Sequence, residues 1–181
     1  MNIFAIDEDP YISAFELCDQ HIVKMPTESI QILVSALLIS GAEQDKMPLT
    51  KSGKYHRGGY RNHPASIWAA ESYVNFSWLC EHTYGLLLEY GKRYSKIHFA
   101  SEQLDSILKL DIKEYIPDTG NLFPTEFVRC FNQSQGRNLD LLDFEKWPCD
   151  HEAYREFYRR EKNDFAKWNK TKERPKWMDS V

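Results

Sequence analysis

The segment DQHIVKMPTESIQILVSALLIS, residues 19–40, decides the fold because it is long, largely apolar and free of glycine. Its apolar residues recur at the three- and four-residue spacing of an α-helix on nearly every side, which predicts a helix largely enclosed by the rest of the protein. Asp19 is expected to cap this helix and Gly41 to end it. Pro26 leaves two alternatives: a kink within one continuous helix, or a helix that starts near Met25 with the proline in its first turn.

Three ionisable side chains, His21, Lys24 and Glu28, interrupt the first half of this helix. On a helix His21 and Glu28 project within about 20° of each other and roughly 10 Å apart along the axis, with Lys24 close to the same stripe. A carboxylate on an enclosed helix must be paired, hydrogen-bonded or beside a water-filled pocket. Two interpretations therefore stay open. One is a Lys24–Glu28 ion pair with a core histidine, and the other is a pocket wall that carries an acid or base.

Further helices are expected where apolar residues recur at helical spacing between turn signals. In the second of them Gly85 indicates either close packing against a neighbour or a weak point. Ser101 and Asp150 are expected to cap the last two. The expected ranges are residues 11–18, 64–90, 101–110 and 151–169.

These patterns predict an all-α fold, a compact single-domain helical bundle with long irregular connections. The domain should span residues 1–181. Residues 10–110 would form the helical core, residues 111–150 an irregular wrap, and residues 151–170 a C-terminal helix followed by a tail.

The composition, with 42% hydrophobic and 28% charged residues, is that of an ordinary globular protein. No apolar stretch is expected to reach the roughly 20 residues that span a bilayer, and no signal peptide is recognised at the start. We therefore expect a cytosolic protein of bacterial or phage origin that does not bind membranes. The four scattered cysteines predict reduced, mostly buried thiols. The net charge of −4 argues against a protein that coats nucleic acid with its whole surface.

A basic loop at residues 50–64 contains three glycines and no acidic residue. Glycines let a backbone approach an anion, basic side chains bind phosphate, and tyrosine stacks on bases. A solvated loop without function is the alternative. The candidate nucleic-acid-binding residues in this loop are Lys51, Lys54, Tyr55, His56, Arg57, Tyr60, Arg61 and His63.

The stretch Asp19-Gln20-His21, with Glu28 seven residues after the histidine, resembles the first helix of the pyrimidine-dimer DNA glycosylases, the phage endonuclease V family. The resemblance implies that Glu28 is the catalytic carboxylate and that Gln20 and His21 are its neighbours in a DNA-facing pocket. Residues 78–90 and Arg174-Pro175-Lys176-Trp177 are similar to two later stretches of that family.

The chain also departs from the family pattern. That family uses the α-amine of a threonine exposed by removal of the initiator methionine, and this amine attacks the sugar C1′. Here the second residue is Asn2, whose bulk should leave Met1 in place. Either the amine of Met1 serves, or the chain lacks lyase chemistry. Residues 113–150 have no counterpart in the family, whose DNA binders are strongly basic.

The sequence therefore favours a DNA N-glycosylase acting on damaged or modified pyrimidines. Glu28 would stabilise charge on the sugar, His21 would assist, and the amine of Met1 would be the nucleophile. Gln20, Lys24 and the basic loop would bind DNA, and no metal or organic cofactor is required. One alternative is a non-catalytic, phage-encoded module that binds nucleic acid or protein. Another is a metal-dependent hydrolase of nucleotides that uses His21, Glu28, His63 or His82.

Overall fold

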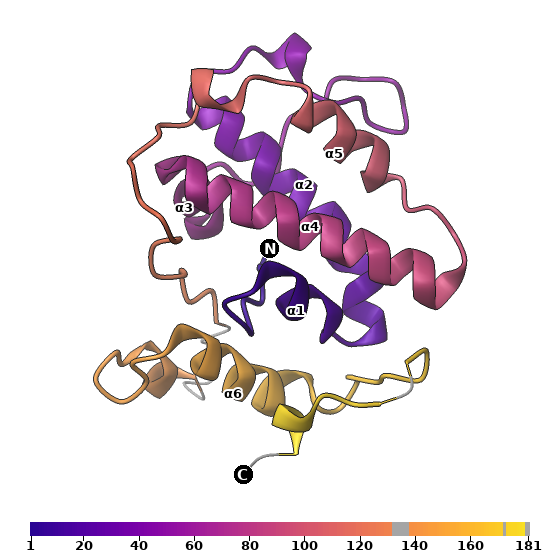
Figure 1. Cartoon of the computed structure of the whole chain (residues 1–181), viewed down its shortest axis with the longest axis vertical. Helices are drawn as coiled ribbons and strands as arrows, with labels where there is room; N and C mark the ends of the chain where they lie inside the picture. The colour runs from indigo at the N-terminus through magenta and orange to yellow at the C-terminus, as the bar shows by residue number, and fades with distance from the viewer. Residues whose placement is uncertain (132–137, 172, 180–181) are drawn as a thin grey trace.

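A computed structural model describes residues 1–131, 138–171 and 173–179, and within these residues the secondary structure is helical (Figure 1). There is no strand in this part of the chain; one isolated antiparallel bridge joins Leu49 and Tyr55. The all-α expectation is confirmed. The α-helices are α1 (Pro10–Phe15), α2 (Asp19–Ile39), α3 (Pro64–Glu71), α4 (Tyr73–Tyr94), α5 (Ala100–Leu108) and α6 (Asp150–Lys162).

Helix α2 is continuous, and Pro26 lies inside it without ending it. The prediction that Asp19 caps this helix is wrong, because Cys18 occupies the cap position and no side chain bonds the first turn. The Asp19 carboxylate instead accepts hydrogen bonds from Arg93 (3.1 Å) and from the backbone of Lys170 (3.0 Å). These bonds tie the start of α2 to α4 and to the C-terminal segment.

Helix α2 also meets the length and composition of a membrane-spanning helix, contrary to the expectation from the sequence. Two thirds of its most apolar window (67%) is buried inside the protein. It packs against α3, α4 and α5 and forms the centre of the hydrophobic core. Its apolar character is therefore accounted for by burial among these helices.

The expected single helix over residues 64–90 is wrong, because the chain breaks at Ser72 into α3 and α4. Ser72 is extended (φ −153°, ψ 152°), and its side-chain oxygen accepts the backbone N–H of Asn75 at 3.1 Å. This is an N-cap in the middle of an apolar run. The close packing expected of Gly85 is confirmed, since a Cβ at this position would lie only 2.8 Å from the Cβ of Ala14 in α1.

Two further caps differ from expectation. Phe99 occupies the cap position of α5 and makes no side-chain cap bond, so Ser101 is not the cap. The ring of His98 accepts the N–H of Ala100, the first residue of the helix, at 3.1 Å. The Asp150 carboxylate binds Arg129 (2.7 Å) and the backbone of Phe127 (2.8 Å), so it holds the irregular segment instead of capping α6.

Helix α6 ends at Lys162, seven residues short of the predicted end. The chain turns away after it and places the indole of Trp168 where its N–H donates to the carbonyl of Glu16 at 3.0 Å. The irregular wrap is expected over residues 111–150. In the described part of this range, before α6, the structure has short 3₁₀ turns at Ile112–Glu114 and Leu139–Leu142.

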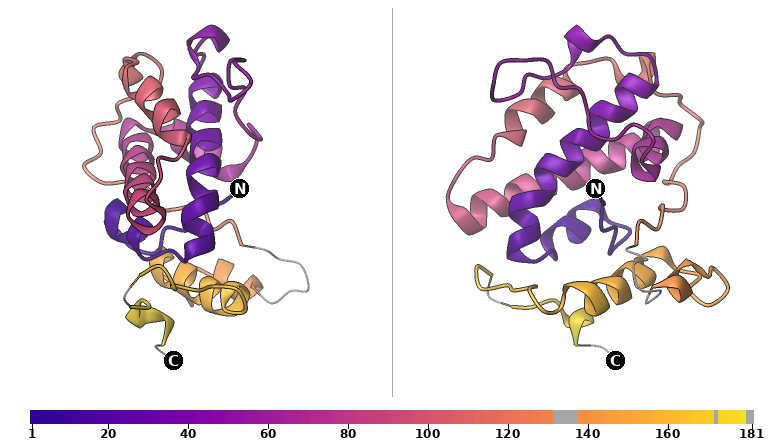
Figure 2. Two further views of the ribbon diagram at one scale, coloured as in Figure 1. Left: turned by 90° about the vertical axis from the view of Figure 1, so that its right-hand side faces the viewer. Right: turned by 180° about the vertical axis from the view of Figure 1, so that it is seen from behind.

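Helix α6 forms a separate layer beneath the other helices, with the first residues of the chain between the two (Figure 2). The ring of Phe4 stacks on Phe157 of α6, and the carbonyl of Ala5 contacts the ring of His151 at 2.8 Å. Phe4 adopts a positive φ of 55°, which turns the chain within this layer. The N-terminus is thereby held beside the first half of α2.

Candidate active site

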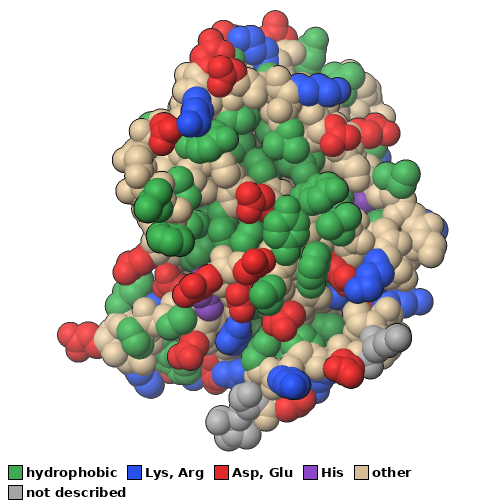
Figure 3. Space-filling view, in the orientation of Figure 1, with side chains coloured by type: hydrophobic (Ala, Val, Ile, Leu, Met, Phe, Trp, Pro, Cys, Tyr) green, Lys and Arg blue, Asp and Glu red, His purple; other side chains and the backbone are tan. Residues whose placement is uncertain are grey.

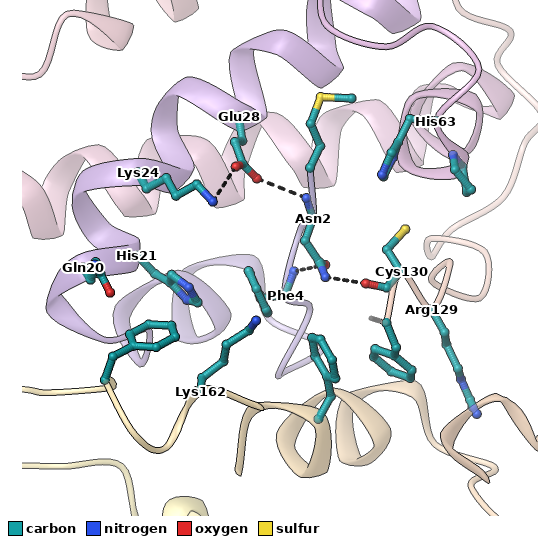
Figure 4. A pocket seen from close by; sticks show the side chains of 15 residues that line it. Asn2, Phe4, Gln20, His21, Lys24, Glu28, His63, Arg129, Cys130 and Lys162 are labelled. Atoms are coloured by element: carbon teal, nitrogen blue, oxygen red, sulfur yellow. Dashed lines mark hydrogen bonds and ion pairs between the residues drawn. The ribbon is translucent and has the colours of Figure 1, made fainter. Parts of the chain in front are cut away.

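A pocket of about 680 Å³ opens where the N-terminal residues, α2, the start of α3 and the end of α6 meet (Figure 4). This volume lies within the range of small-molecule and cofactor sites. Its wall combines aromatic rings with basic, acidic and amide groups. The lining residues are Met1, Asn2, Phe4, Gln20, His21, Lys24, Glu28, His63, Pro64, Arg129, Cys130, Phe131, Phe157, Lys162 and Phe165.

Glu28 is the carboxylate of this pocket, and its side chain is 15% exposed. One carboxylate oxygen lies 3.0 Å from Nζ of Lys24, and the other accepts the backbone N–H of Asn2 at 3.2 Å. Both interpretations of the ionic stripe therefore hold at once, since Glu28 is ion-paired and also faces the pocket. In the full chain the nitrogen beside Glu28 is a peptide amide, because Met1 precedes it.

The side chain of Asn2 holds the N-terminal residues in place. Its amide donates to the carbonyl of Cys130 (2.8 Å), and its oxygen accepts the N–H groups of Ile3 (2.7 Å) and Phe4 (3.0 Å). The amine of Met1 lies near His63. Burial lowers the pKa of His63, the positive N-terminus lowers it further, and Glu28 opposes both. The N-terminal amine and Glu28 thus belong to one electrostatic cluster.

His21 is a buried, neutral histidine. The hydroxyl of Tyr158 accepts the N–H of Cys18 at 3.0 Å and also forms a hydrogen bond with Nδ1 of His21, 2.8 Å away, whose direction depends on the tautomer of the ring. Burial lowers the pKa of His21 to about 3, with smaller contributions from the nearby Lys162 and Lys24. At neutral pH His21 is a hydrogen-bond donor without charge.

Lys162, the last residue of α6, brings a further cation to the pocket, beside Lys24 and Arg129 (Figure 4). Its Nζ lies 5.0 Å from the ring centre of Phe157 and 5.9 Å from that of Phe4. Among the described residues Lys162 makes no ion pair with a carboxylate. Burial lowers the pKa of this half-buried amine, and Lys24 lowers it further, while acidic neighbours oppose the effect.

The predicted site residues divide into two groups. Met1, Gln20, His21, Lys24, Glu28 and His63 share the pocket. The other residues of the basic loop do not line it. At the tip, Lys51 lies 5.5 Å from the ring of Phe99 beside α5. The exposed residues among the rest are Lys54, Tyr55, Arg57, Tyr60 and Arg61.

The loop approaches the pocket only near its end. A Cβ at Gly59 would lie 2.6 Å from the sulfur of Met1, so the loop backbone packs directly on the first residue. Before it, the half-buried His56 accepts the N–H of Gly58 at 2.9 Å and shapes the turn. His82, named with the metal alternative, lies apart from the pocket and is stacked on Trp78. The described residues contain no group of three or more His, Cys, Asp or Glu arranged for a metal ion.

Sequence reasoning missed several lining residues, among them Asn2 as a backbone donor, Phe4, Cys130 and Lys162. Lys162 is one of many basic residues in α6, and no spacing in the sequence relates it to Glu28. The only signal for Asn2 was its place next to Met1. The N-terminal segment, the irregular segment before α6 and α6 itself bring these residues together only through tertiary packing.

A family model described as pyrimidine dimer DNA glycosylase matches residues 1–102, more than half of the 181-residue chain. Comparison with curated proteins and with solved structures gives no match. The matched region contains Met1, Gln20, His21, Lys24, Glu28 and His63, and it ends before α6. One wall of the pocket, with Lys162, therefore comes from outside the matched region.

Proposed function

Because the chain belongs to the pyrimidine dimer DNA glycosylase family, we propose that it excises damaged or modified pyrimidines from DNA in the pocket beside Glu28. The observation that carries the proposal is the position of this glutamate. It lies in a nucleotide-sized pocket and accepts a hydrogen bond from the N-terminal backbone at 3.2 Å. The first half of α2 resembles the first helix of that family, and this resemblance also implies that Glu28 is the catalytic carboxylate.

Glu28 suits the charge that develops when a glycosidic bond breaks. As the base departs, positive charge builds on C1′ and O4′ of the sugar, and a carboxylate held in place by fixed donors stabilises it without reorganising. Lys24 and the N–H of Asn2 are these donors. In the covalent form of the mechanism, an amine attacks C1′ while the bond to the base breaks. The amine of Met1 is the first candidate for that nucleophile.

The pocket also offers a means of recognising an extruded base. The neutral ring of His21 stacks on Phe4 with a centroid distance of 4.5 Å, and in the tautomer that carries its proton on Nε2 the ring can donate to a base carbonyl. A flipped base is read by hydrogen bonds to its edge and by packing between flat side chains. Phe131, Phe157 and Phe165 supply further rings. This combination favours a pyrimidine or its photoproduct.

The charge distribution supports an approach of DNA from the α2 side. On the opposite face, formed by α1 and α4, hydrophobic side chains gather with acidic ones among them (Figure 3). Helix α2 and the N-terminus lie at the front in the right-hand view of Figure 2. Lys24 and Lys162 line the pocket on this side. DNA phosphates require cationic partners, and these two lysines provide them.

The test is base release from an ultraviolet-irradiated duplex, with borohydride added in parallel to trap a covalent adduct. The wild-type protein should release bases, and Glu28→Gln should lower the rate at least about a hundredfold while duplex binding persists. Glu102→Gln is the matched control, because Glu102 is an exposed carboxylate in α5. Absence of both base release and adduct with the wild-type protein would reject the proposal.

One observation favours the non-catalytic alternative. The Lys24–Glu28 ion pair at 3.0 Å gives the glutamate a structural role that needs no chemistry. A module of this kind would bind DNA without turnover, and its affinity would fall steeply with salt. Replacing Lys54, Arg57 and Arg61 by alanine would weaken such binding. The same base-release assay separates the two functions.

A further inference from the structure

Tyr60 is an exposed aromatic residue of the basic loop, next to the pocket. It is 65% exposed and does not line the pocket itself. The chain just before it packs on the first residue, because a Cβ at Gly59 would lie 2.6 Å from the sulfur of Met1. Shortly after it, His63 lines the pocket. The side chain of Tyr60 therefore faces solvent at the rim of the candidate active site.

Two glycines press the basic loop onto α2. The N–H of Gly59 donates to Oγ of Ser35 (2.9 Å) and to the carbonyl of Gln31 (3.2 Å). At Gly58, where φ is +76°, an added Cβ would lie 2.5 Å from the same Oγ. Neither position leaves room for a larger residue. This stretch of backbone therefore lies directly on the helix that carries Glu28.

The backbone after Tyr60 is held as well. The carbonyl of Tyr60 accepts the N–H of His63 at 3.0 Å and the hydroxyl of Ser66, a residue of α3, at 3.2 Å. Because the backbone is already ordered, binding a ligand with this side chain costs little further conformational freedom. Tyrosine also has only two side-chain torsions to fix. Its ring is thus a stiff projection beside the pocket.

Arg57 and Arg61 bring positive charge to both sides of Tyr60 in the sequence, and both are exposed. Among the described residues neither arginine forms an ion pair with a carboxylate. Cations of this kind hold DNA phosphates and fix the position of a protein on the duplex. Proteins that stack on nucleic-acid bases combine such cations with aromatic rings. The segment therefore offers a ring for a base and charges for the adjacent backbone.

A base that moves into the pocket leaves a gap in the duplex, and the lost stacking opposes its extrusion. Proteins that deform DNA hold the unstacked state by inserting a side chain between base steps. We propose that Tyr60 inserts its ring into the gap left by the extruded base, while Arg57 and Arg61 hold the neighbouring phosphates. This inference rests on the proposed glycosylase function and deepens it by naming the residue that keeps the base extruded.

The experiment compares base release from two duplexes that each carry a single pyrimidine dimer, either opposite complementary bases or opposite mismatched bases. Tyr60→Ala should release base from the paired duplex at least about tenfold more slowly than the wild type, because stacking of the ring is lost. On the mismatched duplex the loss should be at most about threefold, since an unpaired base is extruded more easily. Tyr60→Phe keeps the ring and should keep the wild-type rate on both.

Two measurements complete the design. Tyr84→Ala is the matched control, because Tyr84 is an exposed tyrosine of α4 that contacts Tyr11 of α1 on the opposite face. Titration with undamaged duplex gives a readout apart from activity. Tyr60→Ala should bind undamaged duplex within about twofold of the wild-type affinity, because no base is extruded there. Circular dichroism of each variant checks folding.

The possible results are distinguishable. Equal losses on the two duplexes, an equal loss in Tyr60→Phe, or no loss in Tyr60→Ala would each overturn the role of Tyr60 and leave the glycosylase proposal standing. An equally large loss of affinity for undamaged duplex would do the same, because it would indicate a general DNA contact. Absence of base release with the wild-type protein would overturn the glycosylase proposal and this inference with it. Slow release from the paired duplex alone, restored in Tyr60→Phe, supports the insertion.

Discussion

Replacing His82 with phenylalanine should make the protein more resistant to acid. His82 lies in α4, is completely buried, and stacks on Trp78 with a centroid distance of 5.1 Å and an interplanar angle of 11°. Neither of its ring nitrogens has a hydrogen-bond partner among the described residues. Burial lowers its pKa from 6.5 to about 3. The native state therefore holds this ring neutral across most of the acidic range.

The size of the effect follows from proton linkage. Between about pH 6.5 and pH 3 the unfolded chain protonates this histidine and the native state does not, so the free energy of unfolding falls as the pH is lowered. Each pH unit is worth about 1.4 kcal/mol, which gives roughly 2.7 kcal/mol at about pH 4.5. His82→Phe keeps an aromatic ring against Trp78 and removes the titration. At neutral pH the variant should be equally or more stable, because it also removes two unpaired polar atoms.

The measurement is urea unfolding of wild-type and His82→Phe protein at neutral pH and at about pH 4.5. The difference in unfolding free energy between the two proteins should grow by roughly 2–3 kcal/mol in favour of the variant on acidification. His98→Asn is the control, because His98 is only partly buried. An acid-induced loss in His82→Phe equal to that of the wild type would refute the reasoning. His21, also neutral at this pH, contributes to both proteins alike.

Two further predictions concern bonds that hold the helices in place. Arg93→Met should lower the free energy of unfolding by about 3–5 kcal/mol in urea titrations, because it leaves the buried Glu89, 2.8 Å from the guanidinium, without that partner. Lys92→Met, which removes an exposed partner of the same glutamate, should cost less than about 1 kcal/mol, and equal losses would contradict this account. Tyr158→Phe should cost about 1–3 kcal/mol in thermal unfolding, because it removes the partner of a buried backbone N–H and of His21. No measurable loss would show that these bonds are dispensable.

Local patterns were enough to predict α2, α6 and the all-α class, because the hydrophobic period is strong in these segments. They failed at Ser72, where a single cap residue inside an apolar run splits one expected helix into two. They also failed at Asp19, since its carboxylate is drawn to Arg93 by a contact between distant segments. A contact between residues that are far apart in the sequence cannot be predicted from the pattern of neighbouring residues.

The site shows the same division. The half of the pocket carried by α2 was predictable, because His21, Lys24 and Glu28 share one stripe of one helix. The half carried by α6 was not, because Lys162 reaches the pocket only when α6 packs beneath the N-terminal segment. The composition of the basic loop predicted a nucleic-acid-binding segment, yet of its candidate residues only His63 lines the pocket.

The packing of the first residues has a practical consequence for handling the protein. Met1 lines the pocket, and Asn2 is fixed by bonds to Glu28 and Cys130. A purification tag fused ahead of Met1 would emerge inside the pocket and occupy the space that a nucleotide needs. Recombinant protein for activity assays should therefore carry its tag at the C-terminus, and the identity of the first residue should be verified by mass spectrometry before any negative result is accepted.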